Sequence, residues 1–166
     1  AAQTTPEYAG MGTTLVVAVY RGDKLWLGHI GDSRAYRLRH GHLEQLTRDH
    51  SLLQEQIDAG LITAEQAVYS MHKNLVTRAV GVEEVVDLEV HDHSVEPGDV
   101  LLMCSDGLSD MLEDEQIAQL LRSDDSLADV GASLVEAANA AGGQDNIAVV
   151  LARAKPGTGS FGRSWW

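Results

Sequence analysis

The chain has 166 residues, of which 44 % are hydrophobic and 16 are glycine, a composition that favours one globular domain and excludes disorder for most of its length. Its 25 acidic residues outnumber 12 basic ones, and the formal charge of −13 argues against nucleic acid or an anionic membrane as the main partner. A single cysteine excludes an intrachain disulfide and favours a reducing, cytoplasmic setting, and no apolar run is long enough to predict a membrane span.

Residues 13–47 predict a series of antiparallel hairpins. The β-branched and alternating segments are joined by very short connections rich in Gly and Asp, such as Gly22-Asp23 and His40-Gly41, which leave no room for crossover helices. We expect strands within residues 13–21, 24–31, 34–40 and 42–47. The tripeptide Arg-Gly-Asp at residues 21–23 is interpreted as one of these hairpin turns rather than as an adhesion motif.

Residues 49–80 interrupt the strands with helical patterns. A helix is predicted over residues 49–60, with Asp49 or Ser51 at its start and Gly60 at its end. A second is predicted from Thr63, because Gln66 three residues later completes a capping-box pattern. Long excursions of this kind are commonly functional, and we expect this one to lie on top of the sheet.

The remainder of the chain returns to strands and adds two helices. Strands are predicted over residues 86–95, 99–106 and 146–154, and helices over residues 113–123 and 126–143. The strand at 99–106 is apolar throughout, so we expect it to be buried on both faces. Seven mostly antiparallel strands with helices predict an α+β layered sandwich of two sheets, covering residues 1–154, and the Gly- and Ser-rich residues 155–166 predict a tail or linker.

Three aspartates occupy the junctions between these strands and tight turns. Asp32 follows one strand in Gly-Asp-Ser, Asp106 ends the apolar strand in Ser-Asp-Gly, and Asp145 precedes the last strand in Gly-Gly-Gln-Asp-Asn. Each motif alone is more typical of a plain turn. If the strand ends meet at one edge, however, the three carboxylates converge and repel one another unless a cation binds. Oxygen-only ligands favour Mg²⁺ or Mn²⁺ over zinc.

Two other features carry weaker hypotheses. His91 and His93 lie on one face of a predicted strand and could bind a metal, but no third ligand is evident, so an exposed strand is favoured. Cys104 lies inside the apolar strand without the Gly-rich, Arg-ending loop of a cysteine phosphatase, and we interpret it as a core residue.

Six motifs, in order, resemble the metal-dependent protein phosphatases, the type 2C serine/threonine phosphatases of the bacterial kind. They are GMGTT at 10–14, GDSRAY at 31–36, LTRDHS at 46–51, NLVTRAVG at 74–81, CSDGLSDML at 104–112 and DNIAVV at 145–150. The resemblance covers about residues 8–154.

This resemblance implies a β-sandwich flanked by helix pairs on both sides, with two core Mg²⁺ or Mn²⁺ ions and a weaker third at one edge. It implies that Asp106 and Asp145 bind the second core ion, and that Asp32 shares the third ion with Asp106. It also implies a flap over residues 49–74 that carries His72 near the approaching substrate. The implied function is hydrolysis of phosphate monoesters on phosphoproteins by a metal-activated water. The implied partners are these phosphorylated proteins and a cognate serine/threonine kinase.

The sequence departs from the family at its start. The family's phosphate-binding Arg, its first-metal acids and its Asp-Gly-Met-Gly-Gly turn have no counterpart here, because no Asp precedes Gly10-Met11-Gly12. We therefore expect a fold that is incomplete at the N-terminus and a chain that, alone, hydrolyses a generic aryl phosphate poorly. The alternative function is a truncated or non-catalytic phosphatase-like domain that acts as a binding module.

Overall fold

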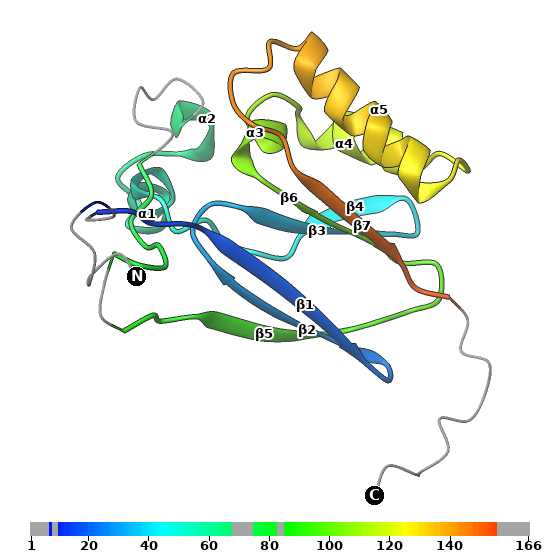
Figure 1. Ribbon diagram of the computed structural model, residues 1–166, viewed down its shortest axis with the longest axis horizontal. Helices are drawn as coiled ribbons and strands as arrows, with labels where there is room; N and C mark the ends of the chain where they lie inside the picture. Colours follow the sequence, from blue (N-terminus) through cyan, green and yellow to red (C-terminus); the bar gives the residue numbers. More distant parts are fainter. Residues whose placement is uncertain (1–6, 8–9, 68–74, 83–84, 156–166) are drawn as a thin grey trace, which may run out of the picture.

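The computed structural model describes residue 7 and residues 10–67, 75–82 and 85–155. Within these residues the chain forms seven strands and five helices (Figure 1). The strands are β1 (Leu15–Arg21), β2 (Lys24–Ile30), β3 (Arg34–Arg39), β4 (His42–Gln45), β5 (Glu89–Ser94), β6 (Val100–Cys104) and β7 (Val149–Arg153), and the helices are α1 (Leu52–Asp58), α2 (Ala64–Ala67), α3 (Asp106–Ser109), α4 (Asp114–Leu121) and α5 (Leu127–Ala140).

The strands form two antiparallel sheets, which confirms the predicted α+β sandwich. One sheet has the order β1-β2-β5 and the other has the order β4-β3-β6-β7. The first four strands are the predicted hairpins, and the Arg-Gly-Asp tripeptide lies in the β1–β2 turn, where Arg21 pairs with Lys24 and Gly22 takes a φ of 66°. This turn uses the positive φ that glycine adopts without a steric cost.

Two apolar cores hold the layers together. Leu25 and Leu27 of β2 pack against Ala35 and Leu101 of the other sheet, which fills the space between the sheets. A larger core lies between the four-stranded sheet and helices α3, α4 and α5, where Tyr36, Leu102 and Leu134 are fully buried. The strand β6 contributes to both cores, as its continuous apolar sequence predicts.

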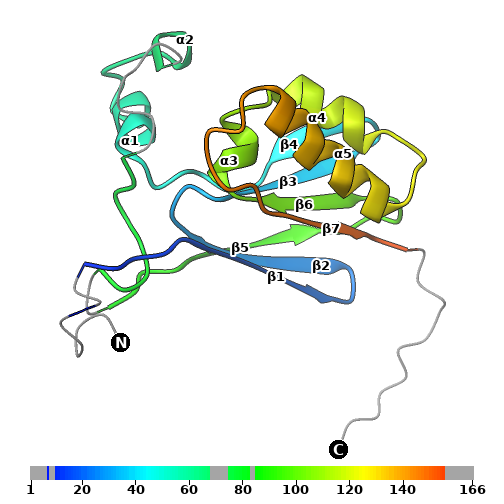
Figure 2. The ribbon, with the colours of Figure 1, turned by 45° about the horizontal axis from the view of Figure 1, so that its top comes forward.

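The helices cover one sheet only among the described residues. Helices α3–α5 lie over the outer face of the four-stranded sheet, while the outer face of β1, β2 and β5 carries no described helix (Figure 2). Val17, Val19 and Trp26 on that face are 41 %, 53 % and 44 % exposed. The second helical layer that the resemblance implies is therefore not formed by the described part of the chain.

The excursion after β4 lies beside one end of the sandwich, not on top of a sheet as predicted (Figures 1 and 2). Its backbone is attached at its two ends, where Thr77 donates to the carbonyl of His50 and Leu52 to that of Leu75. The predicted caps are confirmed: the Ser51 hydroxyl accepts from the Gln54 amide at the start of α1, and Thr63 and Gln66 exchange the two bonds of a capping box. Helix α1 has seven residues, and none of them is buried. It therefore has no buried apolar face that would pack against a sheet.

Candidate metal centre

The register of the four-stranded sheet brings two of the three predicted aspartates together. Arg34 pairs with Cys104 at the end where β3 begins and β6 ends. Because the pairing is antiparallel, two further steps past this pair lead to Asp32 on one side and Asp106 on the other. The pKa of Asp32 is raised by its burial and, next, by the negative charge of Asp106.

Asp106 is the first residue of helix α3 rather than the last residue of a strand. The strand β6 ends at Cys104, Ser105 is the N-cap, and Asp106 accepts a 2.8 Å hydrogen bond from the amide of Gly107. The apolar run predicts the strand correctly up to Cys104, and the strand ends there because helix α3 begins. An acidic residue in a first helical turn also faces the partial positive charge of the helix N-terminus.

The loop that carries Asp145 is fixed directly against this helix. The Ser105 hydroxyl donates to the carbonyl of Asn146 at 3.1 Å and accepts from the amide of Ala148 at 3.0 Å. A Cβ atom at Gly107 would lie 2.4 Å from the carbonyl oxygen of Asn146, so only glycine permits this approach. The backbones next to Asp106 and Asp145 are therefore in contact.

The turn that carries Asp32 is built as tightly. Gly31 has a φ of 103°, and a Cβ atom there would lie 2.3 Å from the Thr14 side chain. Thr14 and Ser33 share a 2.8 Å hydrogen bond across this turn. Gly31 and Gly107 of the predicted motifs are therefore required for steric reasons, whether or not a ligand binds beside them.

The three carboxylates do not form one compact triad. Across the described residues, the group of three His, Cys, Asp or Glu side chains whose ligand atoms lie within 4.8 Å of one another is His29, His50 and Glu89. Asp32 and Asp106 are half-buried and Asp145 is exposed.

The donor set fits a hard divalent cation. Asp49 and Asp110 add to the negative field that raises the pKa of Asp32, after burial and Asp106. A group of acids in mutual repulsion, with carboxylate oxygens as its donors, is stabilised by Mg²⁺ or Mn²⁺. Asp49 itself is held by a bidentate ion pair with Arg34, whose guanidinium also donates to the Tyr36 hydroxyl.

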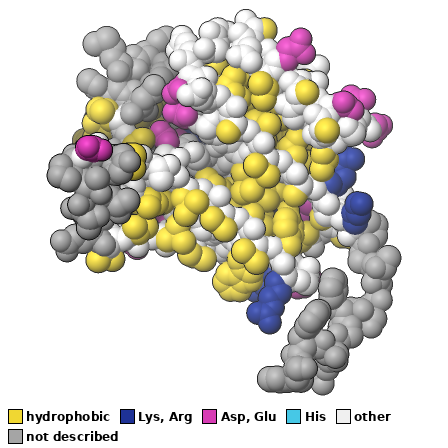
Figure 3. All heavy atoms as spheres, viewed as in Figure 1, with side chains coloured by type: hydrophobic (Ala, Val, Ile, Leu, Met, Phe, Trp, Pro, Cys, Tyr) yellow, Lys and Arg dark blue, Asp and Glu magenta, His cyan; other side chains and the backbone are white. Residues whose placement is uncertain are grey.

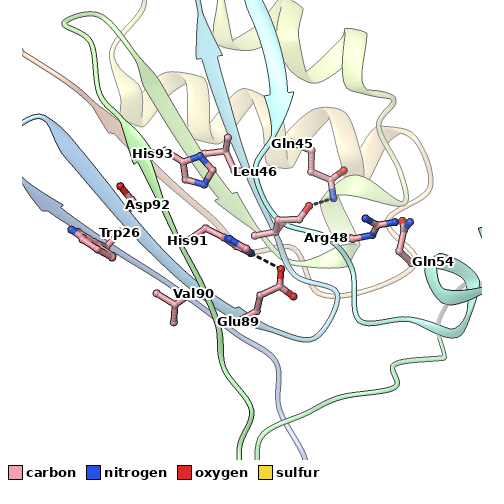
Figure 4. A pocket seen from close by; sticks show the side chains of 11 residues that line it. Trp26, Gln45, Leu46, Arg48, Gln54, Glu89, Val90, His91, Asp92 and His93 are labelled. Carbon is pink, nitrogen blue, oxygen red and sulfur yellow. Dashed lines mark hydrogen bonds and ion pairs between the residues drawn. The ribbon is translucent and has the colours of Figure 1, made fainter. Parts of the chain in front are cut away.

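The other sequence hypotheses have separate outcomes. Cys104 is buried, and burial raises the pKa of its thiol to about 12, so it is a core residue as predicted. His91 and His93 do lie on one face of β5, but that face borders an open cavity of about 670 Å³ and His91 donates to Glu89 at 2.5 Å (Figure 4). His72 lies outside the described residues.

Sequence reasoning missed the group formed by His29, His50 and Glu89. His29 is 1 % exposed and His50 is 7 % exposed, and their rings stack with centroids 4.7 Å apart. The signal for His29 was its position in the inward-facing alternation of Leu25 and Leu27. His50 and Glu89 are 39 residues apart and carry no local signal for their contact.

Comparison with known proteins assigns the family. Residues 1–147 match the family Protein phosphatase 2C, and the chain belongs to this family. It is 39 % identical over 150 residues to the serine/threonine phosphatase stp of Listeria welshimeri, covering 90 % of this chain and 60 % of that protein. It is 42 % identical over 144 residues to the protein phosphatase PhpP of Streptococcus pneumoniae, covering 87 % and 58 %.

Solved structures agree with this assignment. The Mycobacterium tuberculosis serine/threonine phosphatase PstP/Ppp superposes with a TM-score of 0.89 at 39 % identity, covering 93 % of this chain and 65 % of that one. A catalytic domain of PstP in complex with two manganese ions superposes with a TM-score of 0.83 at 39 % identity, covering 93 % and 64 %. The chain thus spans about three fifths of the length of the relatives it matches.

No helix in the described part of the chain is both long enough and apolar enough to cross a membrane.

Proposed function

We propose that this chain carries part of the active site of a metal-dependent serine/threonine protein phosphatase, with Asp32, Asp106 and Asp145 as Mg²⁺ or Mn²⁺ ligands. The observation that carries the proposal is the strand register that sets Asp32 opposite Asp106, with the Asp145 loop packed on Gly107. Family membership and the two manganese ions of the PstP catalytic domain support the choice of metal and reaction.

The residues of the chain have defined parts in this function. Bound divalent ions supply the Lewis acidity that phosphate-monoester hydrolysis requires. Ser105 fixes the start of the helix that carries Asp106 to the Asn146 loop, which keeps the backbones of Asp106 and Asp145 near each other. Asp32 adds a carboxylate whose pKa is raised by burial and by Asp106, so it loses a destabilising repulsion when a cation binds.

The substrates and setting follow as further parts of the proposal. The names of the relatives support phosphoserine and phosphothreonine proteins as substrates, and a serine/threonine kinase as the enzyme that opposes this one. The reduced, buried Cys104 and the acidic composition support a cytoplasmic location without nucleic acid as a partner.

The test is a Mn²⁺ titration of the 166-residue chain, with free Mn²⁺ followed by electron paramagnetic resonance. We expect binding that weakens at least roughly tenfold in Asp106→Asn and in Asp145→Asn, the scale on which loss of a metal contact acts. Asp87→Asn, which removes an equal charge from a side chain that is 90 % exposed, is the matched control and should bind as the parent does. Binding that is absent, or equal in all variants, contradicts the assignment of ligands.

Hydrolysis is measured in parallel on an aryl phosphate and a phosphothreonine peptide. Turnover by this chain should be slow, because the sequence has no Asp-Gly-Met-Gly-Gly turn, but any turnover should require Mn²⁺ and be lost in Asp106→Asn. Metal-independent turnover, or rates equal to those of a relative such as PhpP, would show that this account of the site is wrong.

A further inference from the structure

His50 binds the turn that precedes Asp32 through both its backbone and its side chain. The His50 amide donates to the carbonyl of Gly31 at 2.9 Å, and the Gly31 amide donates to Nδ1 of His50 at 3.2 Å. On the other side of the same residue, the Thr14 side chain occupies the space that a Cβ atom would need. Gly31 is therefore held between Thr14 and His50, one residue before the proposed ligand.

Glu89 in turn holds the His50 ring. Its Oε2 lies 3.0 Å from Nε2 of His50, and its Oε1 lies 2.5 Å from Nε2 of His91. The His29 ring stacks on the face of the His50 ring. Nε2 of His29 lies 2.8 Å from the carbonyl oxygen of Arg48. These residues, His29, His50, Glu89 and His91, are called the Glu89 cluster below.

The Glu89 cluster has the composition of a metal site, but the hydrogen bonds of His50 argue against one. His29, His50 and Glu89 bring ligand atoms within 4.8 Å, and Nδ1 of His29 is buried without a hydrogen-bond partner among the described residues. Nδ1 of His50, however, accepts from Gly31, so in the neutral ring the proton is on Nε2. A protonated Nε2 donates to Glu89 and has no lone pair for a metal.

We propose that His50 and Glu89 are positioning residues, which orient the Asp32 carboxylate toward Asp106 by fixing the backbone of Gly31. This inference rests on the proposed function, because it gives Asp32 a role as a metal ligand. Glu89 fixes the tautomer and the rotation of the His50 ring, and the ring fixes Gly31. Asp32 follows directly in the chain, so a rotated Gly31 peptide changes the direction in which its carboxylate points.

The charge state of Glu89 supports this role. Burial alone raises the pKa of Glu89, but hydrogen bonds from His91 and His50 outweigh it and lower the pKa to about 2. The carboxylate is therefore charged at any physiological pH and remains an acceptor for Nε2 of His50. A charged acceptor gives a stronger hydrogen bond than a neutral one, which favours a single orientation of the ring.

The test compares Mn²⁺ affinity of the 166-residue chain in His50→Leu, His50→Asn and Glu89→Leu, with Asp32→Asn as the reference for loss of the ligand itself. We expect His50→Leu and Glu89→Leu to weaken the Asp32-dependent binding about 10-fold or more, the effect typical of residues that orient a ligand. His50→Asn retains an amide oxygen close to the position of Nδ1, so it should recover part of that affinity.

A structural control separates orientation from a general loss of stability. Thr47 is buried in the same connection, and its hydroxyl accepts from the Ala35 amide at 3.0 Å, not from that of Gly31. Thr47→Val should therefore lower the melting temperature as His50→Leu does but leave Mn²⁺ affinity within about twofold of the parent. Equal losses of affinity in Thr47→Val and His50→Leu would overturn the positioning role.

A second readout reports on the ring itself. Nitrogen-15 spectra of the histidines should show His50 as the Nε2–H tautomer in the parent and a mixture of tautomers in Glu89→Leu. If Asp32→Asn does not change Mn²⁺ binding, the proposed ligand fails and the positioning role fails with it. If Asp32→Asn weakens binding and His50→Leu does not, only the positioning role fails. A nitrogen hyperfine coupling of a directly bound imidazole in the electron spin echo spectrum of bound Mn²⁺ would instead identify the Glu89 cluster as the metal site and also overturn the proposal.

Discussion

Asp106 shows how a carboxylate can be placed by the backbone around it rather than by ion pairs. Its neighbours Ser105 and Gly107 hold the loop of Asn146 by two side-chain hydrogen bonds and one close backbone approach. The electrostatic partners of Asp32 include Asp106, Asp49 and Asp110, all of the same sign. Asp49 is neutralised by its ion pair with Arg34, whereas the repulsion between Asp32 and Asp106 opposes folding until a cation binds.

Asp106→Asn should therefore make the metal-free chain slightly more stable. The amide keeps an oxygen for the Gly107 N–H and removes one charge, so repulsion with Asp32 falls and the free energy of unfolding should rise by about 0.5 kcal/mol at pH 7. Thermal unfolding without metal, with Asp87→Asn as the charge-matched control, measures the gain. A loss of stability in Asp106→Asn would mean that Asp106 is held by a favourable contact and is not repelled.

Glu89 should make a measurable contribution to stability in acid. Its pKa of about 2 lies below the ordinary value of 4.5, so the carboxylate stabilises the fold fully above about pH 4.5, and this contribution is lost as the pH falls through 2. Because the side chain is one third exposed, we expect about 1 kcal/mol and not the full amount that the shift implies. Urea unfolding of the parent and Glu89→Gln from pH 6 to pH 2 should give curves that converge toward pH 2. A constant difference over this range would contradict the assignment.

At the scale of elements, strands and helices followed from the sequence wherever one face was apolar. The alternation in β2, the continuous apolar run of β6 and the stripe Val130, Leu134, Ala138 in α5 all predicted the observed burial. Helix α3 was not predicted, because four residues are too few for a helical period to show. The predicted position of the excursion, on top of the sheet, was wrong, because local sequence carries no information on where a weakly apolar segment packs.

The candidate site could likewise be predicted only where its residues carry a local signal. Asp32, Asp106 and Asp145 were found because each has a glycine within two residues at an element end, which is a local signal. The Glu89 cluster was not found, because its contacts join β2, β5 and the segment before α1 across long stretches of chain. Contacts between side chains that are distant in sequence depend on register and layer packing, which a single sequence does not specify.

The junction between α3 and the loop before β7 yields a matched pair of glycine substitutions. Gly107→Ala places a methyl group 2.4 Å from the Asn146 carbonyl oxygen, so we expect a loss of about 1–3 kcal/mol and weaker Mn²⁺ binding as Asp106 and Asp145 separate. Gly131→Ala in α5 meets only Leu151 and Val149 at 3.6 Å and 3.7 Å, and should gain roughly 0.5–1 kcal/mol from helix propensity.

Denaturant unfolding and Mn²⁺ titration of both glycine variants test this prediction. Equal stability of the two variants, or undiminished Mn²⁺ affinity in Gly107→Ala, would show that the junction between α3 and the loop is not rigid. In that case the close approach of the two backbones would not be what holds Asp106 near Asp145.

At the scale of the whole molecule, the two sheets differ in how they meet solvent. Helices α3–α5 seal one sheet over a core of fully buried side chains, whereas large apolar side chains remain exposed on the other sheet. Figure 3 shows hydrophobic side chains gathered over the face that presents β1 in this view. The chain therefore combines a well-packed half with a half whose outer surface is apolar, which agrees with its spanning about three fifths of its relatives.

This asymmetry predicts that the chain binds a hydrophobic dye while fully folded. Val17 and Val19 alternate outward along β1, and Val19 lies directly opposite Trp26, so the pair forms part of a continuous apolar strip. Val17→Thr combined with Val19→Thr retains β-branching but adds two hydroxyls, and it should lower anilinonaphthalene sulfonate fluorescence by about one third or more while unfolding changes by less than about 0.5 kcal/mol. Val85→Thr, at a position that is 77 % exposed and outside both sheets, is the control and should leave the fluorescence unchanged. Dye binding that is the same in the parent and the double variant would mean that the strip formed by Val17, Val19 and Trp26 is not the surface that binds the dye.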